Sequence, residues 1–188
     1  MAGTCERIRG SPVTIMEICG SHTHVIAKYG LRQLVPDHVR FVSGPGCPVC
    51  VTSPADIDEA IACAKAGATV AIFGDMIRVP GSYGSLAQER AAGGDIRIVY
   101  SPLAALKLAQ DNPHMQVVFV ATGFETTAPG IALTVVQAHR EKVKNFFVLS
   151  LLKTMPAVLR FLLATGSAVD AFLLPGHVCT VIGIEPCF

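Results

Sequence analysis

Short apolar runs rich in β-branched residues alternate with helical patterns along almost the whole chain. This alternation predicts an α/β fold in which parallel sheets are built from βαβ units. The runs that read as strands lie at residues 13–18, 39–43, 69–73, 96–100, 116–121, 146–151 and 171–174. The expected helices lie between them, at about residues 24–34, 53–67, 101–111, 128–140 and 155–164.

Two of these helices carry clear start signals. Ser53-Pro54 and Ser101-Pro102 each place a serine at the N-cap and a proline at the first helical position. The strands are almost entirely apolar, which is typical of sheets that are covered on both faces. Only 15% of the residues are charged, below the usual share of about 25%. The chain is therefore expected to be globular, with little spare polar surface.

The break Asp111-Asn112-Pro113 is the expected domain boundary. It predicts one α/β domain over residues 1–112, which holds the CGSHTH and CPVC loops. The second α/β domain then covers residues 113–188 and holds the TGFETT and PGHV loops.

Charge and hydropathy exclude several classes of function. A net charge of +1 and a pI of about 7.6 give no electrostatic basis for binding nucleic acid or an anionic membrane. The longest apolar runs are strand-sized, and residues 1–10 lack the apolar segment of a signal peptide. We therefore expect a cytoplasmic protein whose seven cysteines are thiols rather than structural disulfides.

The sequence GPGCPVC places Cys47 and Cys50 directly after a predicted strand. A CxxC pair in a turn forms a small disulfide ring or gives two thiolates to a metal. A redox pair is favoured, because a structural zinc site needs four ligands and the chain has no second CxxC or HxxxH. The alternative is two buried thiols that only pack.

The sequence MEICGSHTH places Cys19 and His22 at the end of another predicted strand. A thiolate with an imidazole suits iron, zinc or copper, and an adjacent histidine also activates a cysteine as a nucleophile. The alternative is an ordinary helix start capped by Ser21 or Thr23, with incidental histidines.

Two further loops are candidate binding sites. TGFETT is a glycine loop between a strand and a helix, where backbone N–H groups can face an anion; the alternative is capping by Thr126 or Thr127. PGH presents a lone histidine after the last strand, a place that is often structural. The candidate binding residues are Thr122, Gly123, Glu125, Thr126 and His177. Because all these loops follow strands, we expect them and the three loop cysteines to face one crevice.

Taken together, MEICGSHTH, GPGCPVC, TGFETT and PGHV resemble the HypD family of hydrogenase maturation proteins, from about Val13 to Ile184. The resemblance implies a scaffold that assembles the Fe(CN)2CO unit of nickel–iron hydrogenases with a HypC-type chaperone and a HypE-type cyanide donor. Cys19 matches the family's iron-binding cysteine, and His22 matches the histidine expected to orient or protonate near the iron. Cys47 and Cys50 match its redox pair.

The resemblance also implies two α/β domains around a cleft and a third part that carries a [4Fe–4S] cluster. Family members are about twice as long as this chain, and their cluster ligands lie in a C-terminal region without a counterpart here. The second domain is accordingly expected to be incomplete. Two other interpretations stay open: a thiol–disulfide oxidoreductase, because GPGCPVC precedes a helix, and a fragment that folds only with a missing half.

Overall fold

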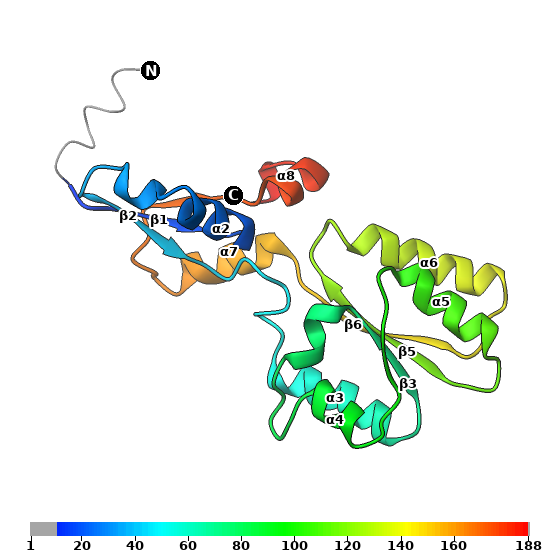
Figure 1. The fold of residues 1–188 in the computed structure, drawn as a ribbon. Helices are drawn as coiled ribbons and strands as arrows, with labels where there is room; N and C mark the ends of the chain where they lie inside the picture. The colour runs from blue at the N-terminus through cyan, green and yellow to red at the C-terminus, as the bar shows by residue number, and fades with distance from the viewer. Residues whose placement is uncertain (1–10, 188) are drawn as a thin grey trace. The chain divides into compact units, whose positions relative to one another are not determined.

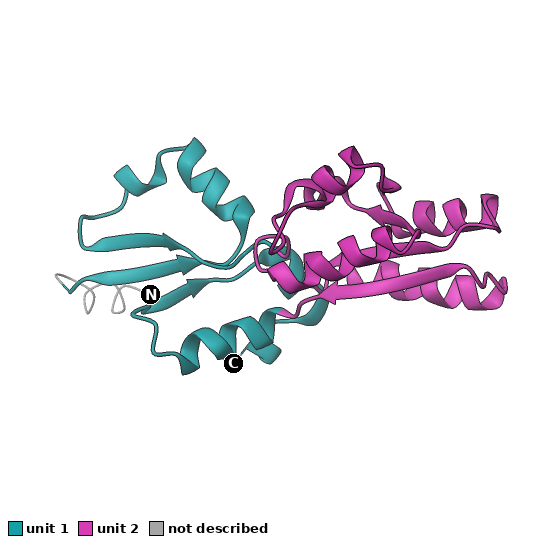
Figure 2. Ribbon diagram, turned by 90° about the horizontal axis from the view of Figure 1, so that it is seen from below, with its two compact units in different colours: residues 1–47, 155–188 teal, residues 48–154 magenta. Residues whose placement is uncertain are grey.

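The computed structural model describes residues 11–187, which form two compact units. Unit 1 takes its described residues from 11–47 and 155–187, and unit 2 consists of residues 48–154 (Figure 2). The interpretation of residues 1–10 lies outside the described part of the chain. Among the described residues, no helix combines the length and the apolar character that a bilayer crossing requires.

Unit 1 contains a three-stranded parallel sheet in the order β2-β1-β7. Helices α2 and α7 lie on opposite faces of this sheet, as both views show (Figures 1 and 2). The short helix α8 follows β7 directly. The bounds are β1 Val13–Glu17, α2 Gly20–Lys28, β2 Val39–Ser43, α7 Met155–Ala164, β7 Ala171–Leu173 and α8 Gly176–Ile182, with 3-10 turns at Leu31–Gln33 and Glu185–Cys187.

Unit 2 contains a four-stranded parallel sheet in the order β4-β3-β5-β6. Helices α3 and α4 cover one face, and α5 and α6 cover the other (Figure 1). The bounds are α3 Pro54–Lys65, β3 Thr69–Ile72, α4 Leu86–Ala91, β4 Ile96–Ile98, α5 Pro102–Asp111, β5 Val117–Gly123, α6 Ala128–Arg140 and β6 Phe146–Leu152, with a 3-10 turn η2 at Gly74–Arg78.

Each face of the unit 2 sheet has its own apolar core. One core joins Ile57 of α3 and Leu86 of α4 to Ile72 of β3. The other packs Ala105 of α5 and Ile131 of α6 onto Phe119 of β5. All these side chains are almost fully buried. The sequence prediction of parallel α/β sheets covered on both faces is thereby confirmed.

The division into units differs from the two domains expected from the sequence. The expected boundary after residue 112 falls inside unit 2, because β5 pairs with β3 across that turn. The C-terminal segment returns to unit 1, because β7 pairs with β1. Long-range strand pairing, rather than order along the chain, therefore decides which motifs share a unit.

The local predictions succeed where capping chemistry is strong. Ser53 forms a capping box with Asp56 at the start of α3, and Ser101 caps α5. The helix expected at 24–34 was wrong at its start, since α2 begins at Gly20 and ends at Lys28. The residue at its N-cap, Cys19, is not a usual capping residue, and its first turn holds glycine and serine, which have low helix propensity. The sequence signal for the start of this helix was therefore weak. Helices α4 and α8 were not expected.

Candidate functional site

The CGSHTH motif forms the junction between β1 and α2. Cys19 is the N-cap residue of α2 with an extended backbone, and no side chain caps the helix. The structure thus differs from the alternative of a start capped by Ser21 or Thr23. His22 lies in the first turn, where its N–H donates to the Cys19 carbonyl at 2.9 Å. Cys19 therefore stands at the positive end of a nine-residue helix, which favours a negatively charged group.

A hollow of about 410 Å³ in unit 1 brings Cys19, His22 and His177 together. Pairing of β7 with β1, continued by a bond from Ile18 N–H to the Leu173 carbonyl (3.1 Å), places the PGH segment beside Cys19. The expected meeting of these two motifs at one sheet edge is seen here. The hollow, called the Cys19 hollow below, is lined by Cys19, Ser21, His22, Val25, Gly176, His177 and Thr180.

The imidazole of His22 presents a polar atom without a partner in the described structure. Its Nδ1 is buried and makes no hydrogen bond. A buried polar atom normally has a partner, since leaving it unpaired costs free energy. His22 also lines the Cys19 hollow, so its imidazole is a candidate for binding there.

The CPVC loop packs directly on the backbone that precedes Cys19. Gly44 N–H donates to the Glu17 carbonyl at 2.9 Å. A Cβ atom added at Gly46 would lie 1.7 Å from the Ile18 carbonyl oxygen and 2.6 Å from the Cys19 Cα. Because neighbouring Cα atoms are about 3.8 Å apart, the Cα atoms of Cys19 and Cys47 lie within about 8 Å of each other. Glycine at position 46 therefore permits this close approach.

The two cysteines of the CPVC loop differ in environment. Cys47 is a partly buried free thiol at the end of unit 1, whereas Cys50 is exposed and belongs to unit 2. The Thr52 hydroxyl donates to the Pro48 carbonyl at 2.9 Å and tightens the turn. Helix α3 begins only at Pro54, so neither cysteine lies in its first turn. The thioredoxin-type placement of a CxxC pair on a helix N-terminus is thus not what the structure shows.

Glu17 is a site residue to which the sequence analysis gave no role. It is fully buried, and its Oε1 accepts hydrogen bonds from Ser43 Oγ (2.9 Å) and Arg32 Nη2 (3.2 Å). The bond from Ser43 fastens the end of β1 to the end of β2, directly before Cys19 and the CPVC loop, and the bond from Arg32 ties the 3-10 turn at Leu31–Gln33 to β1. The available signal was an acid that ends an otherwise apolar strand, VTIME.

The TGFETT loop belongs to unit 2. Thr122 and Gly123 still form part of β5, and Thr127 is the N-cap of α6 without a side-chain cap bond. The alternative of capping by Thr127 is therefore not seen. Glu125 is partly buried and Thr126 is exposed. The Gly123 carbonyl accepts a hydrogen bond from Lys153 N–H at 3.0 Å. Since the loop lies in the other unit, its expected meeting with the Cys19 hollow stays a prediction.

A charged pair stands beside this loop. Lys153 Nζ lies 3.3 Å from Asp56 Oδ2. Partial burial raises the pKa of Asp56, but hydrogen bonds from Ser53 and the charge of Lys153 outweigh it, so that the pKa lies below its ordinary value of 3.8. Sequence reasoning missed Lys153, because its pairing with α3 depends on the packing of α3 beside β6.

Within residues 11–187, no three His, Cys, Asp or Glu side chains gather closely enough to hold a metal ion by themselves. The Cys19 hollow supplies one thiol and two imidazoles at its lining. Chemically, it can offer one soft anionic ligand and hydrogen bonds from imidazole, and the thiol of Cys47 follows Gly46, which packs on the Cys19 backbone.

Comparison with known proteins gives consistent matches along the chain. The family described as "HypD: Hydrogenase formation hypA family" matches residues 2–187. The chain is 51% identical over 184 residues to the Hydrogenase maturation factor HypD of Escherichia coli (strain K12), covering 97% of this chain and 48% of that protein. It is 52% identical over 177 residues to the factor of the same name from Rhodobacter capsulatus, with 93% and 47% covered.

A putative hydrogenase expression/formation protein of Methanocaldococcus jannaschii is 47% identical over 174 residues, with 93% of this chain and 49% of that protein covered. The chain thus spans about half the length of the curated relatives it matches.

Proposed function

Because this chain belongs to the HypD family of hydrogenase formation proteins, we propose that it is a scaffold for assembly of the Fe(CN)2CO unit of nickel–iron hydrogenases. Iron is the cargo of this scaffold. The observation that carries the proposal is the Cys19 hollow, where the thiol of Cys19 and the imidazoles of His22 and His177 line one space. We further propose that the protein works in the cytoplasm, where thiols stay reduced.

Cys19 is the proposed iron ligand of this chain. Thiolate is a soft ligand suited to iron that also carries cyanide and carbonyl. The N-terminus of α2 favours the negative charge of that thiolate. A HypC-type chaperone supplies a further cysteine, so that iron is held between two proteins. A HypE-type protein donates the cyano groups.

The two histidines act on groups bound at Cys19. His22, whose Nδ1 is buried without a hydrogen-bond partner, is proposed to orient or protonate a ligand of the iron. His177 lies in the first turn of α8, far from Cys19 in the sequence, and lines the same hollow. It offers a second polar contact to the incoming ligand.

Cys47 and Cys50 form the proposed redox pair. Oxidation of their two thiols to one disulfide releases two electrons and two protons, which serve ligand chemistry at the iron. The close packing of Gly46 on the backbone of Ile18 and Cys19 supports this role, because it keeps Cys47 near the proposed iron ligand.

The TGFETT loop is the proposed anion-binding element of unit 2. Thr122, Gly123, Glu125 and Thr126 lie where β5 leads into α6. Lys153 donates its backbone N–H to the Gly123 carbonyl, while its side chain pairs with Asp56. A [4Fe–4S] cluster takes four cysteine thiolates. The residues described here do not gather such a set, so they do not fit a cluster, and no step of the proposed chemistry passes through one.

The test is an infrared spectrum of the chain produced anaerobically together with a HypC-type partner. We expect bands from iron-bound cyanide and carbonyl in the purified complex. Cys19→Ala should abolish them, whereas Cys63→Ala, which removes a partly buried thiol of α3 in unit 2, should not. Retention of the bands in the Cys19 variant would refute the assignment. Absence of bands in the parent, with a full-length relative positive, would deny this chain the scaffold function.

A thiol–disulfide oxidoreductase remains the second candidate, supported by the exposure of Cys50. The two functions separate in a turnover assay with a small disulfide substrate. Activity that survives Cys19→Ala but not Cys50→Ser favours the oxidoreductase. The scaffold predicts that no such turnover takes place.

A further inference from the structure

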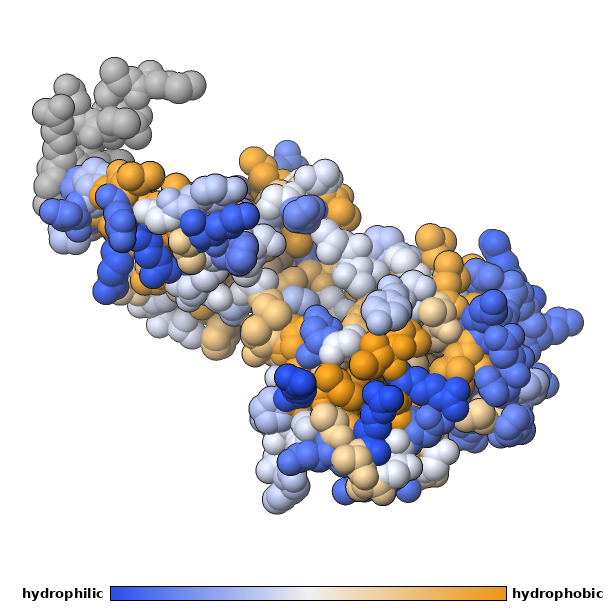
Figure 3. Space-filling model, viewed as in Figure 1, coloured by the Kyte–Doolittle hydropathy of each residue, from blue (hydrophilic) through white to orange (hydrophobic). Residues whose placement is uncertain are grey.

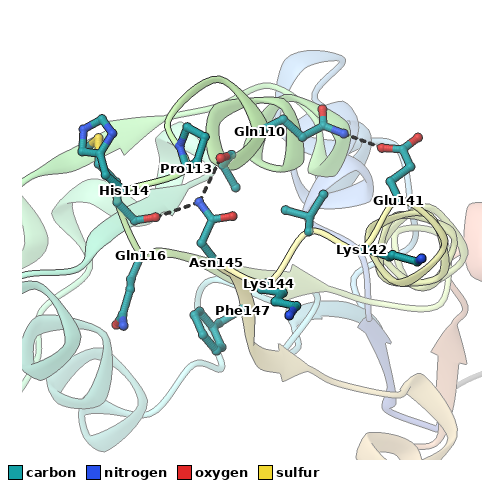
Figure 4. Close-up of a pocket in the computed structure, with 12 residues that line it drawn as sticks. Gln110, Pro113, His114, Gln116, Glu141, Lys142, Lys144, Asn145 and Phe147 are labelled. Atoms are coloured by element: carbon teal, nitrogen blue, oxygen red, sulfur yellow. Dashed lines mark hydrogen bonds between the residues drawn. The ribbon is translucent and has the colours of Figure 1, made fainter.

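A groove in unit 2 lies at the N-terminal ends of β5 and β6, at the opposite end of these strands from the TGFETT loop. It has a volume of about 660 Å³ and is formed by the connection from α5 to β5 and the connection from α6 to β6 (Figure 4). Figure 4 shows His114 and Gln116 on the first connection, and Lys142 and Lys144 on the second. None of the residues proposed for iron assembly lines this groove. It therefore calls for an explanation of its own.

The floor of the groove is preformed. The Asn145 side-chain nitrogen donates to the backbone carbonyls of Ala109 (2.9 Å), Asn112 (3.1 Å) and Met115 (2.8 Å). These bonds fix the two connections to each other, and Figure 4 draws those to Ala109 and Met115 as dashed lines. A ligand that binds such a surface pays little for ordering it, which favours binding.

The rim of the groove carries cations that have no acidic partner among the described residues. Lys142 and Lys144 are exposed, and neither forms an ion pair within the described part of the chain. The nearby acid, Glu141, is bound through its two oxygens by the side-chain amides of Gln110 and Gln137. Figure 3 shows hydrophilic side chains gathered over the end of unit 2 at which α6 ends. The rim thus carries two lysines against one carboxylate and is open to solvent.

The groove also borders an open strand edge. β6 is the last strand of the sheet and pairs with β5 alone among the described residues. Its sequence FFVLSLL has no charge and no proline, and Phe147 is 47% exposed in the groove. Proteins usually protect such an edge, because its free N–H and C=O groups pair with another strand.

We propose that the groove binds an extended acidic segment of a partner protein. The segment adds as a strand along the outer edge of β6, so that its backbone satisfies the free groups of that edge. An apolar side chain of the segment packs on Phe147, and its carboxylates reach Lys142 and Lys144. Nucleic acid fits less well, because it offers no backbone N–H groups for a strand edge and the chain's net charge is only +1.

The probe for this proposal is a fluorescein-labelled peptide of alternating glutamate and valine, measured by fluorescence anisotropy with the full chain. A peptide of alternating lysine and valine and the polyanion heparin serve as comparison ligands. We expect the glutamate–valine peptide to bind, more weakly as salt screens the rim. Amide shifts in a ¹⁵N NMR titration should concentrate on β6 and residues 142–147.

Two variants test the contacts. Lys142→Glu with Lys144→Glu should weaken peptide binding about tenfold or more, since two attractive contacts become repulsive. Phe147→Ser should also weaken it. The control pair Lys107→Glu with Arg160→Glu makes the same charge change on exposed residues outside the groove and should leave binding unchanged. Each variant is first shown to have the same melting temperature as the parent, so that a loss of binding does not reflect a loss of folding.

Three outcomes would overturn the proposal. One is no binding of the glutamate–valine peptide by the parent at low salt. Another is equal binding by the parent and the Lys142/Lys144 variant. The third is heparin or the lysine–valine peptide binding as tightly at the same residues, which would indicate an unspecific charged or apolar surface.

Discussion

Replacing Gly46 with alanine is expected to separate the CPVC loop from Cys19. The added Cβ would lie 1.7 Å from the Ile18 carbonyl oxygen and 2.3 Å from its carbon. Close carbon–oxygen contacts are made at about 3.3 Å, so the two backbones must part by about 1.6 Å. Both atoms that the methyl group meets are backbone, and no flexible side chain can yield in their place.

The cost follows from this displacement. Overpacking of a well-packed site costs about 1–3 kcal/mol. For a chain of this size, that corresponds to a melting temperature lower by roughly 2–12 °C. The displacement also moves Cys47 relative to Cys19, and a misplacement of about 1 Å costs reacting groups on the order of 100-fold in rate.

The assay measures both effects in a Cys50→Ser background, where Cys47 has lost its CxxC partner. Oxidised glutathione is added, and the disulfide between Cys19 and Cys47 is quantified by peptide mass spectrometry beside a thermal melt. Gly46→Ala should lower the melting temperature and slow this disulfide about tenfold or more. Gly20→Ala is the matched control, because its Cβ would meet nothing within 4 Å.

The reasoning is refuted if Gly46→Ala forms the disulfide at the parent's rate with an unchanged melting temperature. It is also refuted if Gly20→Ala shows the same losses, because the effect would then not arise from the contact at Gly46. A lower melting temperature with an unchanged disulfide rate would refute the positioning of Cys47 alone.

Three further predictions concern the stability of the two units. Because the pKa of Asp56 is lowered, its ionised form stabilises the fold above pH 3.8, and this contribution is lost as the pH falls below that value. In urea unfolding, Asp56→Asn should therefore lose less free energy of unfolding than the parent as the pH falls through that range. Asn145→Ala removes three hydrogen bonds and should cost about 2–3 kcal/mol, against about 1 kcal/mol for Asn112→Ala, which removes one, as measured by the same unfolding. Arg32→Met takes the cation from the buried carboxylate of Glu17 and should cost about 2 kcal/mol, less than for a fully buried pair because the arginine is half exposed; equal stability of parent and variant in a thermal melt would contradict this.

Much of the local structure could be predicted from the sequence. The helix starts at Ser53 and Ser101 were correct because a serine cap and a following proline act within one turn. The start of α2 was not, since its first turn, GSH, has low helix propensity and lacks a recognisable cap. The helix forms there because it packs Ile26 into unit 1, and that contact is not local.

The candidate site was predictable only in part. The motifs identified Cys19, His22, Cys47, Cys50 and His177 as candidate site residues. The rule that the carboxyl ends of parallel strands meet at one edge of the sheet placed Cys19 near His177. The burial of Glu17 and the approach of Gly46 to the Cys19 backbone could not be foreseen. They depend on the parallel register in which Glu17 faces Ser43.

The sequence alone determined the fold class, the order of the strands and the family, because apolar periodicity, capping residues and short motifs act over a few neighbouring positions. Only the tertiary structure decided which motifs share a unit. The bond from Thr14 N–H to Asp170 joins residues 156 positions apart, and it forms because β7 completes the sheet that β1 and β2 begin. Pairing over such a distance depends on which strand edges are left open once the whole chain has folded, and no local pattern encodes that choice.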